Sequence, residues 1–248
     1  MTLDPSRFDA LTFDCYGTLV DWERGLLAAL NALLNRHGVR SPGDDALLSL
    51  YAELESEAQR GRYRRYREVL AEVCRRIADR IGITLATGED GLLAESIRDW
   101  PAFADTLQAL RDLKRRYRLA VLSNIDRDLF ALSAPKLGVE LDALITAEDV
   151  RSYKPGHAHF RRGLEVLGLP CERVLHVAQS RYHDIAPARS LGFVTVWVNR
   201  QAGRHGATMP SHAQADIEVP DLATLVSILH GGSLAPRSPP GPLPTILL

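Results

Sequence analysis

The sequence is poor in cysteine, with three residues, Cys15, Cys74 and Cys171, in a chain of 248. An odd number without short paired spacing argues against a disulfide framework and against a thiolate metal site, so we expect reduced thiols. Long hydrophobic runs are also lacking, and none reaches the length that spans a membrane. The first ten residues lack the apolar stretch and cleavage site of a secretory signal peptide. We therefore expect a cytoplasmic protein.

An excess of charge of either sign is absent too. Thirty basic residues stand against 31 acidic ones, which gives a net charge of −1. This balance offers no electrostatic case for nucleic acid or an anionic membrane as a partner, and it favours a small-molecule substrate. Because 46% of the residues are hydrophobic, the chain can bury a substantial core.

Short apolar runs that are bounded by polar or glycine-containing turns predict β-strands. They alternate with helix patterns, several of which stop at a glycine. Strands that alternate with helices indicate a parallel sheet covered on both faces, and ligands of such sheets bind at the carboxyl ends of the strands. The sequence thus predicts an α/β fold with a Rossmann-like, doubly wound parallel sheet. The expected strands are 10–14, 118–124, 143–146, 173–178 and 194–198.

One region breaks the alternation, because residues 22–97 carry helix signals and no convincing strand. Apolar residues at three-and-four spacing from Tyr63 to Ile81 are typical of a helix with one buried face. Placed directly after the first strand, this helical cap would overhang the carboxyl end of that strand and exclude water from a site there. We expect the core domain at 1–21 and 101–230, the cap domain at 22–100 and a disordered tail at 231–248.

Polar residues gather in four clusters at predicted strand ends. Parallel-sheet geometry would bring them together, although they are spread over about 170 residues of the sequence. The clusters are Asp14 with Tyr16 and Thr18, Ser123 with Asn124, Lys154 alone, and Gln179 with Ser180, His183 and Asp184.

At these positions the sequence resembles the haloacid dehalogenase superfamily. The motifs of that family are an aspartate nucleophile in a D-x-x-G-T-L turn, a Ser or Thr after the second strand, a lysine, and an acidic loop after the fourth strand. Here "DCYGTLVD" begins at Asp14, and the other motifs follow in the same order through residues 8–200, with the cap at the usual insertion point. The departures described below point to the type II 2-haloacid dehalogenases, which act without a metal, and the resemblance also implies a homodimer.

The resemblance implies a role for each cluster. Asp14 would be the nucleophile that forms an ester, oriented by Thr18 and by the backbone N–H groups of Cys15 and Tyr16. Lys154 would keep that carboxylate ionised. The remaining assignments are Ser123 and Asn124 as donors to a substrate anion, Asp184 as the residue that positions Lys154 or the hydrolytic water, and Gln179, Ser180 and His183 as substrate-binding residues.

Two departures from the phosphatases of the superfamily favour dehalogenation. Those enzymes carry an aspartate two places after the nucleophile to protonate the leaving alkoxide, whereas this sequence has Tyr16, and a halide needs no proton to leave. They also hold Mg²⁺ with acids of the last loop, where the first acid is here Gln179, which leaves a thin ligand set. The expected cofactor is none, or Mg²⁺ if the protein is instead a phosphatase acting on a small phosphoester.

The halide site does not match the 2-haloacid dehalogenases, which usually carry an arginine in the first long cap helix. The cluster "RGRYRRYR", residues 60–67, could supply the cation, and we take Arg64 as the candidate, with Arg60 and Arg62 as alternatives. The competing interpretation is a solvated helix face. A non-catalytic binding protein that keeps the fold is a further alternative, to which intact Asp14 and Lys154 are opposed.

Overall fold

A six-stranded sheet forms the centre of the protein, of which the computed structural model describes residues 3–200 and 211–231. All neighbouring strands are parallel, in the order β3-β2-β1-β4-β5-β6. The predicted tail, apart from Gly231, lies outside the described residues. The strands are β1 (Ala10–Phe13), β2 (Arg118–Ser123), β3 (Ala143–Thr146), β4 (Val174–Ala178), β5 (Val194–Val198) and β6 (Ile217–Val219).

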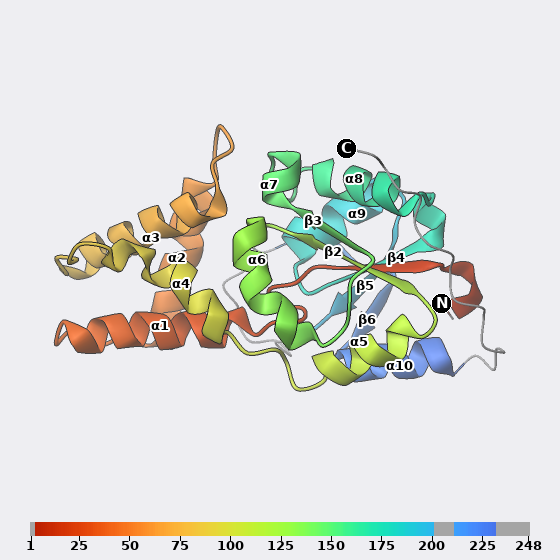
Figure 1. The fold of residues 1–248 in the computed structure, drawn as a ribbon, viewed down its shortest axis with the longest axis horizontal. Coiled ribbons are helices and arrows are strands. Elements are labelled where there is room, and N and C mark those ends of the chain that lie inside the picture. Colours follow the sequence, from red (N-terminus) through yellow and green to blue (C-terminus); the bar gives the residue numbers. More distant parts are fainter. Residues whose placement is uncertain (1–2, 201–210, 232–248) are drawn as a thin grey trace.

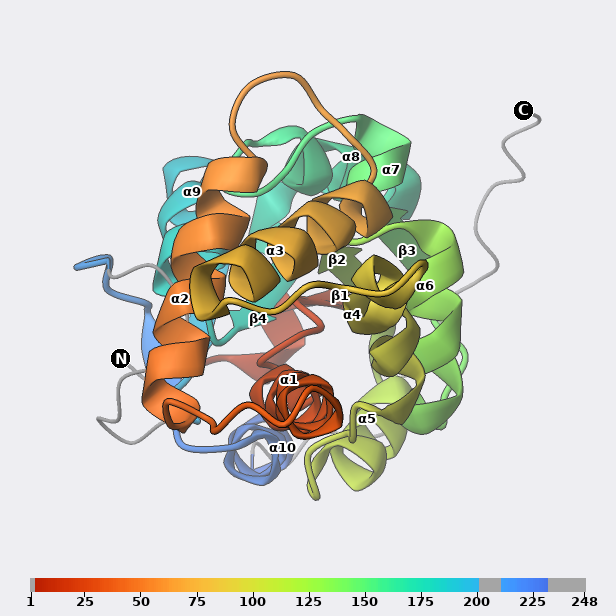
Figure 2. The same ribbon diagram turned by 90° about the vertical axis from the view of Figure 1, so that its left-hand side faces the viewer.

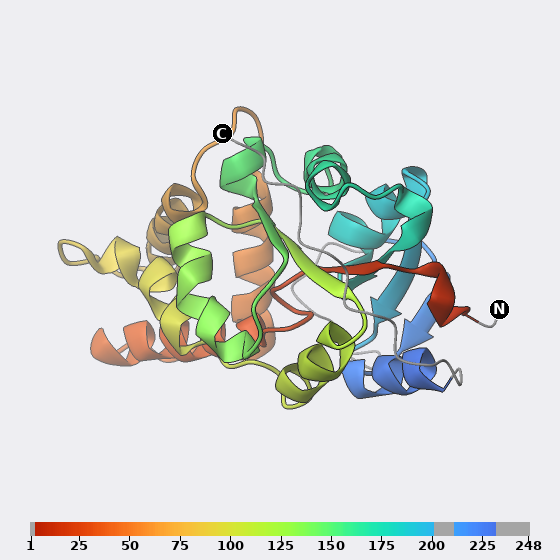
Figure 3. The same ribbon diagram turned by 45° about the vertical axis from the view of Figure 1, so that its right-hand side comes forward.

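Helices cover both faces of the sheet, which confirms the predicted doubly wound α/β fold (Figure 1). Successive residues of a strand point to opposite faces, so Ala10 packs with Phe160 on one side while Leu11 and Phe13 pack in the second apolar cluster. Figure 3 shows α8 on one side of the sheet, with α5 and α10 together on the other. The core helices are α5 (Thr106–Lys114), α6 (Arg127–Ser133), α7 (Ala147–Val150), α8 (Ala158–Leu167), α9 (Ala186–Ser190) and α10 (Leu222–His230).

Four helices between β1 and β2 form what we call the helical insertion. They lie together beside the sheet, and in Figure 2 they are in front of the strands. Gly25 admits the ring of Trp100, since a Cβ at that glycine would lie 2.1 Å from Trp100 Cδ1. The two ends of the insertion are thereby packed against each other. The domain boundaries that the sequence suggests stay a prediction. The helices are α1 (Trp22–Arg36), α2 (Asp44–Ala58), α3 (Tyr66–Ile81) and α4 (Leu92–Ser96).

The structure differs from the sequence prediction at element ends and at one edge of the sheet. The helix expected from Tyr63 begins at Tyr66, and the segment before it runs as a loop. The sequence analysis missed β6, because a three-residue strand leaves almost no periodic signal. Within the described ranges, no helix is both long enough and apolar enough to cross a membrane.

Candidate active site

The carboxylate of Asp14 lies at the carboxyl end of β1, in the middle of the sheet. This strand pairs with β2 on one side and with β4 on the other, and the backbone N–H of Asp14 donates to the Val177 carbonyl at 3.1 Å. The loops that follow β2 and β4 therefore flank Asp14. The residue is only 7% exposed, so its charge needs partners within the protein.

A tight turn after β1 supplies the first of these partners. Gly17 has a φ of +94°, a backbone conformation that side chains with a Cβ rarely adopt, and the turn carries the chain back toward Asp14. The Thr18 hydroxyl then donates to Asp14 Oδ2 at 2.8 Å and accepts from the backbone N–H of Gln179 at 2.9 Å. Thr18 thus joins the loop after β4 to the carboxylate.

The ammonium group of Lys154 supplies the second partner. Its Nζ donates to Asp14 Oδ1 at 2.9 Å, to Asp184 Oδ1 at 2.6 Å and to the Leu122 carbonyl at 2.8 Å. Three acceptors match the three hydrogens of an ammonium, so a charge that is 2% exposed is fully compensated. The structure therefore brings together three of the predicted catalytic residues around one cation.

Burial and charge set the pKa values of this group in opposite directions. Burial raises the pKa of Asp14, while Lys154 and Thr18 favour its ionised form. Burial alone would lower the pKa of Lys154, yet the two carboxylates raise it above its ordinary value. For Asp184, burial acts upward, but Lys154 and His176 bring the pKa down to about 2. Lys154 and Asp184 therefore form a charged pair, and Asp14 titrates in concert with them.

A buried histidine that the sequence analysis missed supports Asp184. His176 in β4 places Nε2 3.3 Å from Asp184 Oδ1 and Nδ1 2.9 Å from the Thr12 hydroxyl of β1. Because an ionised carboxylate can only accept, Nε2 carries a hydrogen and donates it to Asp184. The available signal was one polar residue inside the apolar run of β4, which sequence reasoning cannot separate from an ordinary core histidine.

Above these carboxylates lies a cavity of about 90 Å³. Its floor comes from the strand ends, and its walls come from aromatic side chains and one carboxyl group of the helical insertion. Helical periodicity predicts which residues are buried but not which of them face a cavity, so these wall residues were not predicted. The lining residues are Asp14, Tyr16, Trp22, Tyr51, Glu55, Tyr66, Trp100, Ser123, Asn124, Lys154, Gln179, Ser180, His183 and Asp184.

The phenol of Tyr16 occupies the place where phosphatases of the resembled superfamily carry an acid. Its hydroxyl lies 3.0 Å from Ser133 Oγ, and its ring meets Trp100 edge-on at a centroid distance of 5.6 Å. Burial raises the pKa of Tyr16 well above its usual range. This phenol is therefore a poor proton donor, and it acts as part of the aromatic wall.

Two residues at the carboxyl end of β2, Ser123 and Asn124, line the cavity in different ways. Ser123 Oγ is buried and has no hydrogen-bond partner among the described residues, so it is available to a ligand. The Asn124 side chain is instead engaged with the Lys154 backbone, because Oδ1 accepts from Lys154 N at 2.7 Å and Nδ2 donates to its carbonyl at 3.1 Å. Asn124 therefore fixes the loop that carries Lys154. Its predicted role, donating a hydrogen bond to a substrate anion, could be filled only by the second hydrogen of its amide.

The loop after β4 brings three further predicted residues to the cavity. Ser180 Oγ accepts from the backbone N–H of His183 at 2.9 Å and begins a π-helical turn over Arg181–Ile185. Burial lowers the pKa of His183 to about 4, so its ring is neutral at pH 7. The Gln179 carbonyl accepts from Trp197 Nε1 at 2.7 Å. Their substrate-binding roles stay a prediction.

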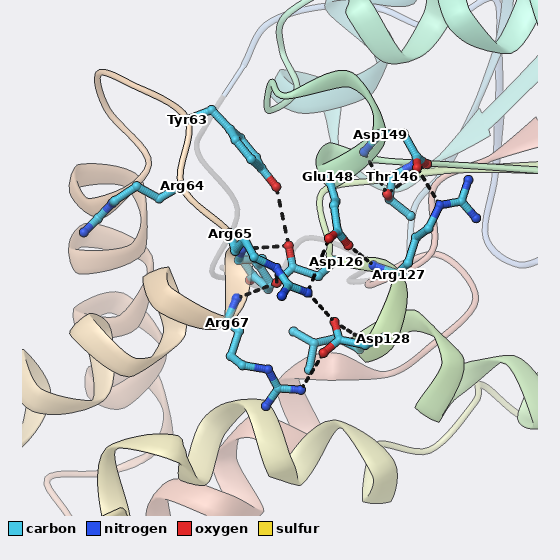
Figure 4. A network of polar contacts seen from close by, with 12 residues as sticks. Tyr63, Arg64, Arg65, Arg67, Asp126, Arg127, Asp128, Thr146, Glu148 and Asp149 are labelled. Carbon is cyan, nitrogen blue, oxygen red and sulfur yellow. Dashed lines mark hydrogen bonds and ion pairs between the residues drawn. The ribbon is translucent and has the colours of Figure 1, made fainter. Parts of the chain in front are cut away.

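Three residues predicted for the site, Thr18, Cys15 and Arg64, are not among those that line the cavity, although Thr18 binds Asp14. Cys15 is fully buried, and its carbonyl accepts from Leu19 N at 2.7 Å within the turn. Arg64 binds Glu72 Oε2 at 2.6 Å and the Ala58 carbonyl at 2.7 Å. Figure 4 shows its side chain pointing away from the adjoining polar network. The structure therefore does not bring Arg64 into the cavity, since Glu72 of α3 pairs with its charge, and the assignment of Arg64 to the substrate site stays a prediction.

The other arginines of residues 60–67 do not line this cavity either. Arg60 instead lines a neighbouring cavity of about 360 Å³ together with Arg151, and Arg62 lies on the exposed loop. The helical insertion thus brings no cation into the cavity within the described part of the chain. The solvated-surface interpretation of the arginine cluster fits this arrangement better.

The donor set of the site bears on metal binding. Asp14 and Asp184 are the two carboxylates at the strand ends, and Lys154 bridges them with an ammonium group that repels a cation. Among residues 3–200 and 211–231, no group of three or more His, Cys, Asp and Glu side chains could hold a metal ion. A hard divalent ion takes six or more oxygen ligands, so the protein groups present fit it poorly.

The site thus consists of an aspartate held by a lysine at the carboxyl end of a central parallel strand, beside an inserted layer of helices. Comparison with known families assigns the chain to a class of hydrolases. Residues 8–192 match the family model described as haloacid dehalogenase-like hydrolase, and the chain belongs to that family.

Similar proteins include two characterised relatives and a solved structure. The chain is 26% identical over 233 residues to haloacetate dehalogenase H-2 of Moraxella sp. (strain B), covering 90% of this chain and 98% of the relative. It is 29% identical over 204 residues to (S)-2-haloacid dehalogenase H-109 of Pseudomonas putida, covering 78% and 86%. The L-2-haloacid dehalogenase of Xanthobacter autotrophicus with chloropropionic acid covalently bound has a TM-score of 0.76 at 22% identity, covering 91% and 100%, which shows a shared fold.

Proposed function

We propose that this protein hydrolyses a short 2-haloacid to a 2-hydroxy acid through an ester on Asp14. The observation that carries the proposal is the small cavity over Asp14, whose floor holds the Lys154 ion pair and whose Tyr16 is unsuited to protonate a leaving group. A halide leaves without a proton, whereas the alkoxide of a phosphoester does not leave readily without one. The named activities of the two relatives support the same reaction.

In the first half of the reaction, an Asp14 oxygen attacks C2 of the substrate. The new C–O bond forms as the C–X bond breaks, and the halide departs with the bonding electron pair. Thr18 and Lys154 hold the two oxygens of the carboxylate, so the nucleophile is oriented before the substrate arrives. The aromatic walls limit access of water to the nucleophile.

The substrate carboxylate needs donors near the nucleophile. Ser123 offers an unpartnered buried hydroxyl, and Asn124 offers its remaining amide hydrogen. Ser123 ends β2 and Asn124 follows it, and both line the cavity with Asp14. We assign the carboxylate to this side, because a buried anion is stabilised only where donors face it.

In the second half, water attacks the carbonyl carbon of the Asp14 ester. The bond between that carbon and the substrate oxygen breaks, the 2-hydroxy acid takes up one proton of the attacking water, the second proton passes to the solvent, and the Asp14 carboxylate is regenerated. Lys154 stabilises the negative charge that develops on the ester oxygen. Asp184 Oδ2 is buried and has no partner within the described residues, so it can accept from the attacking water and orient it.

The reaction as written needs no metal, and a panel of substrates tests it. Halide release is measured from chloroacetate, fluoroacetate and the two enantiomers of 2-chloropropionate, with EDTA present. The wild type should release halide, Asp14→Asn should not, and Asp79→Asn, at an exposed helix position, should behave as the wild type. A single turnover in ¹⁸O-labelled water should place the label in Asp14, because water attacks the ester carbonyl carbon.

Other outcomes select the alternatives. Activity on small phosphoesters that requires added Mg²⁺, without halide release, would identify a phosphatase and overturn the proposal. Absence of all turnover, with a biological effect that survives Asp14→Asn, would identify a binding protein.

A further inference from the structure

The helical insertion places a carboxyl group, Glu55, in the wall of the cavity that holds Asp14. Neither half of the proposed reaction involves the Glu55 side chain. The Glu55 side chain comes from α2, whereas Asp14 comes from the sheet, so the two carboxyl groups approach the substrate from different parts of the fold. Asp184 lines the cavity as well, so Glu55 is its third carboxyl group, and its presence in a cavity proposed to bind an anion requires an explanation, because like charges repel strongly where water is scarce.

The hydrogen bonds of Glu55 distinguish its two oxygens. Oε1 accepts from the Tyr66 hydroxyl at 3.0 Å and from Gln59 Nε2 at 2.5 Å. Oε2 has no hydrogen-bond partner among the described residues, although the side chain lines the cavity. When the carboxyl group is neutral, Oε1, which already accepts two hydrogen bonds, is the carbonyl oxygen, and Oε2 is the hydroxyl oxygen that is left to face a ligand.

Burial raises the pKa of Glu55 to about 7, while the hydrogen bonds from Tyr66 and Gln59 act in the opposite direction. Among the described residues, no positively charged side chain forms an ion pair with Glu55, and the Lys154 ammonium that lines the same cavity is already paired with Asp14 and Asp184. The titratable and charged groups that face Glu55 are Tyr51 of its own helix, Tyr66 of α3, Tyr153 of the loop after α7, and across the cavity Asp14, Lys154, His183 and Asp184.

The net charge of the cavity depends on whether Glu55 is ionised or neutral, and this determines how well the cavity can accept an anionic substrate. Asp14 and Asp184 carry two negative charges against the single positive charge of Lys154. A haloacid adds one more negative charge, and no arginine is among the lining residues. Ionised Glu55 would therefore oppose both the entry of the substrate and the departure of the halide, whereas neutral Glu55 offers an O–H donor.

We propose that Glu55, as a carboxylic acid, donates a hydrogen bond from Oε2 to the departing halide, in place of the arginine that the cavity lacks. The assignment rests on the proposed function. Displacement in line with Asp14 sends the halide away from the sheet, toward the helical insertion. Glu55 keeps its proton throughout, since it stabilises the halide by a hydrogen bond only.

The pH dependence of halide release tests this assignment. Between pH 6 and pH 8 the protonated fraction of a group with a pKa of about 7 falls about tenfold, and the wild-type rate should fall with it. Among the described groups named above, His183 has a pKa of about 4 and Asp184 a pKa of about 2, while the pKa values of Lys154 and the three tyrosines are raised, so none of these groups changes protonation between pH 6 and pH 8. Asp14 must be ionised to react, so its own titration would make the rate rise with pH, not fall.

Glu55→Gln is the informative variant, because its amide keeps the shape and donates at every pH. We expect it to retain most of the activity at pH 6 and to change by less than about twofold up to pH 8. Glu57 lies two residues further along α2, where it is exposed and pairs with Arg76, so Glu57→Gln should keep the pH profile of the wild-type rate. Glu55→Leu, which removes the donor, should be slow at both pH values while unfolding as cooperatively as the wild type.

The outcomes separate the two proposals. Halide release by the wild type with the same falling limb in Glu55→Gln would overturn the role of Glu55 and leave the proposed function intact. No halide release by the wild type from any haloacid would overturn both. A ¹³C-carboxyl NMR titration of labelled glutamate, assigned with Glu55→Gln, should show a group that titrates near pH 7, and a midpoint near 4.5 would overturn the inference without reference to turnover.

Discussion

Asp126 accepts a hydrogen bond from the backbone N–H of Tyr66, the first residue of α3, at 2.9 Å. Its second oxygen accepts from the N–H of Arg67 at the same distance, and the residue is fully buried. Asp126 lies three residues after Ser123, the last residue of β2, so the loop that follows this strand caps a helix of the insertion (Figure 4). A carboxylate at a helix N-terminus pairs with free N–H groups and with the positive end of the helix dipole. This contact fixes the position of Tyr66, which binds Glu55.

We predict that Asp126→Ala lowers the free energy of unfolding by about 1–3 kcal/mol, because two buried N–H groups lose their acceptor. It should also lower turnover, since α3 carries Tyr66 into the cavity wall. Urea denaturation and steady-state kinetics measure both effects. Asp128→Ala is the matched control, because the ion pairs of Asp128 with Arg65 and Arg67 are exposed and their loss should cost less than about 1 kcal/mol. Equal unfolding midpoints for the two variants would contradict the capping role.

Lys154→Met should be the most damaging substitution at the site. It leaves Asp14 and Asp184 buried without their shared cation, which should cost about 3–5 kcal/mol of stability and abolish halide release. Lys154→Arg should not restore the rate, because a planar guanidinium cannot reproduce three converging bonds from one atom. Chemical denaturation and single-turnover kinetics provide the measurements. Lys114→Met, which removes an ion pair at a more exposed position, is the control. Halide release by Lys154→Met at a rate near that of this control would refute the role of Lys154 in the reaction.

Glu55 should make the stability of the protein fall with rising pH. Its pKa is about 7 in the folded state, above the ordinary value of about 4.3 in the unfolded chain. The folded state therefore binds more protons between these values, so its contribution is complete below about pH 4.3 and is lost as the pH rises through about 7. Glu55→Gln removes this loss and should gain on the order of 2 kcal/mol relative to the wild type between pH 4.5 and pH 7.5.

Denaturant titrations at several pH values test this linkage. Glu57→Gln should show the opposite sign, because the bond from Arg76 lowers the pKa of Glu57 and stabilises the folded state at higher pH. Parallel pH curves for the wild type and Glu55→Gln would exclude a raised pKa at Glu55.

Tyr16→Phe should leave kcat/KM within about threefold of the wild type, since the hydroxyl is turned to Ser133 and transfers no proton. The lost hydrogen bond should cost about 1 kcal/mol of stability. Trp100→Phe, which alters the same aromatic contact without touching the hydroxyl, separates packing from hydrogen bonding. A drop in kcat beyond a hundredfold in Tyr16→Phe would mean that the phenol takes part in the chemistry.

The order of strands and helices, the parallel sheet and the cluster around Asp14 could all be derived from the sequence. Strand periodicity and turn chemistry depend on residues close together in the chain, and every parallel strand presents its carboxyl end at the same edge. Asp14, Ser123, Lys154 and Asp184 were therefore predicted to meet, and they line one cavity. Thr18 was predicted beside Asp14, and it binds that carboxylate.

Tertiary packing alone decided which side chains of the helical insertion reach the site. Arg64 lies only two residues from Tyr66, yet its guanidinium forms an ion pair with Glu72 outside the cavity. Tyr66 instead donates to Glu55 in the cavity wall. His176 gained its role from strands that are neighbours in the sheet but distant in the sequence. Helical periodicity specifies a buried face, but the partner of that face depends on how whole elements dock. The position of Asp14 at a strand end was therefore evident from the local sequence pattern, whereas the side chains of the opposite cavity wall could be identified only in the folded chain.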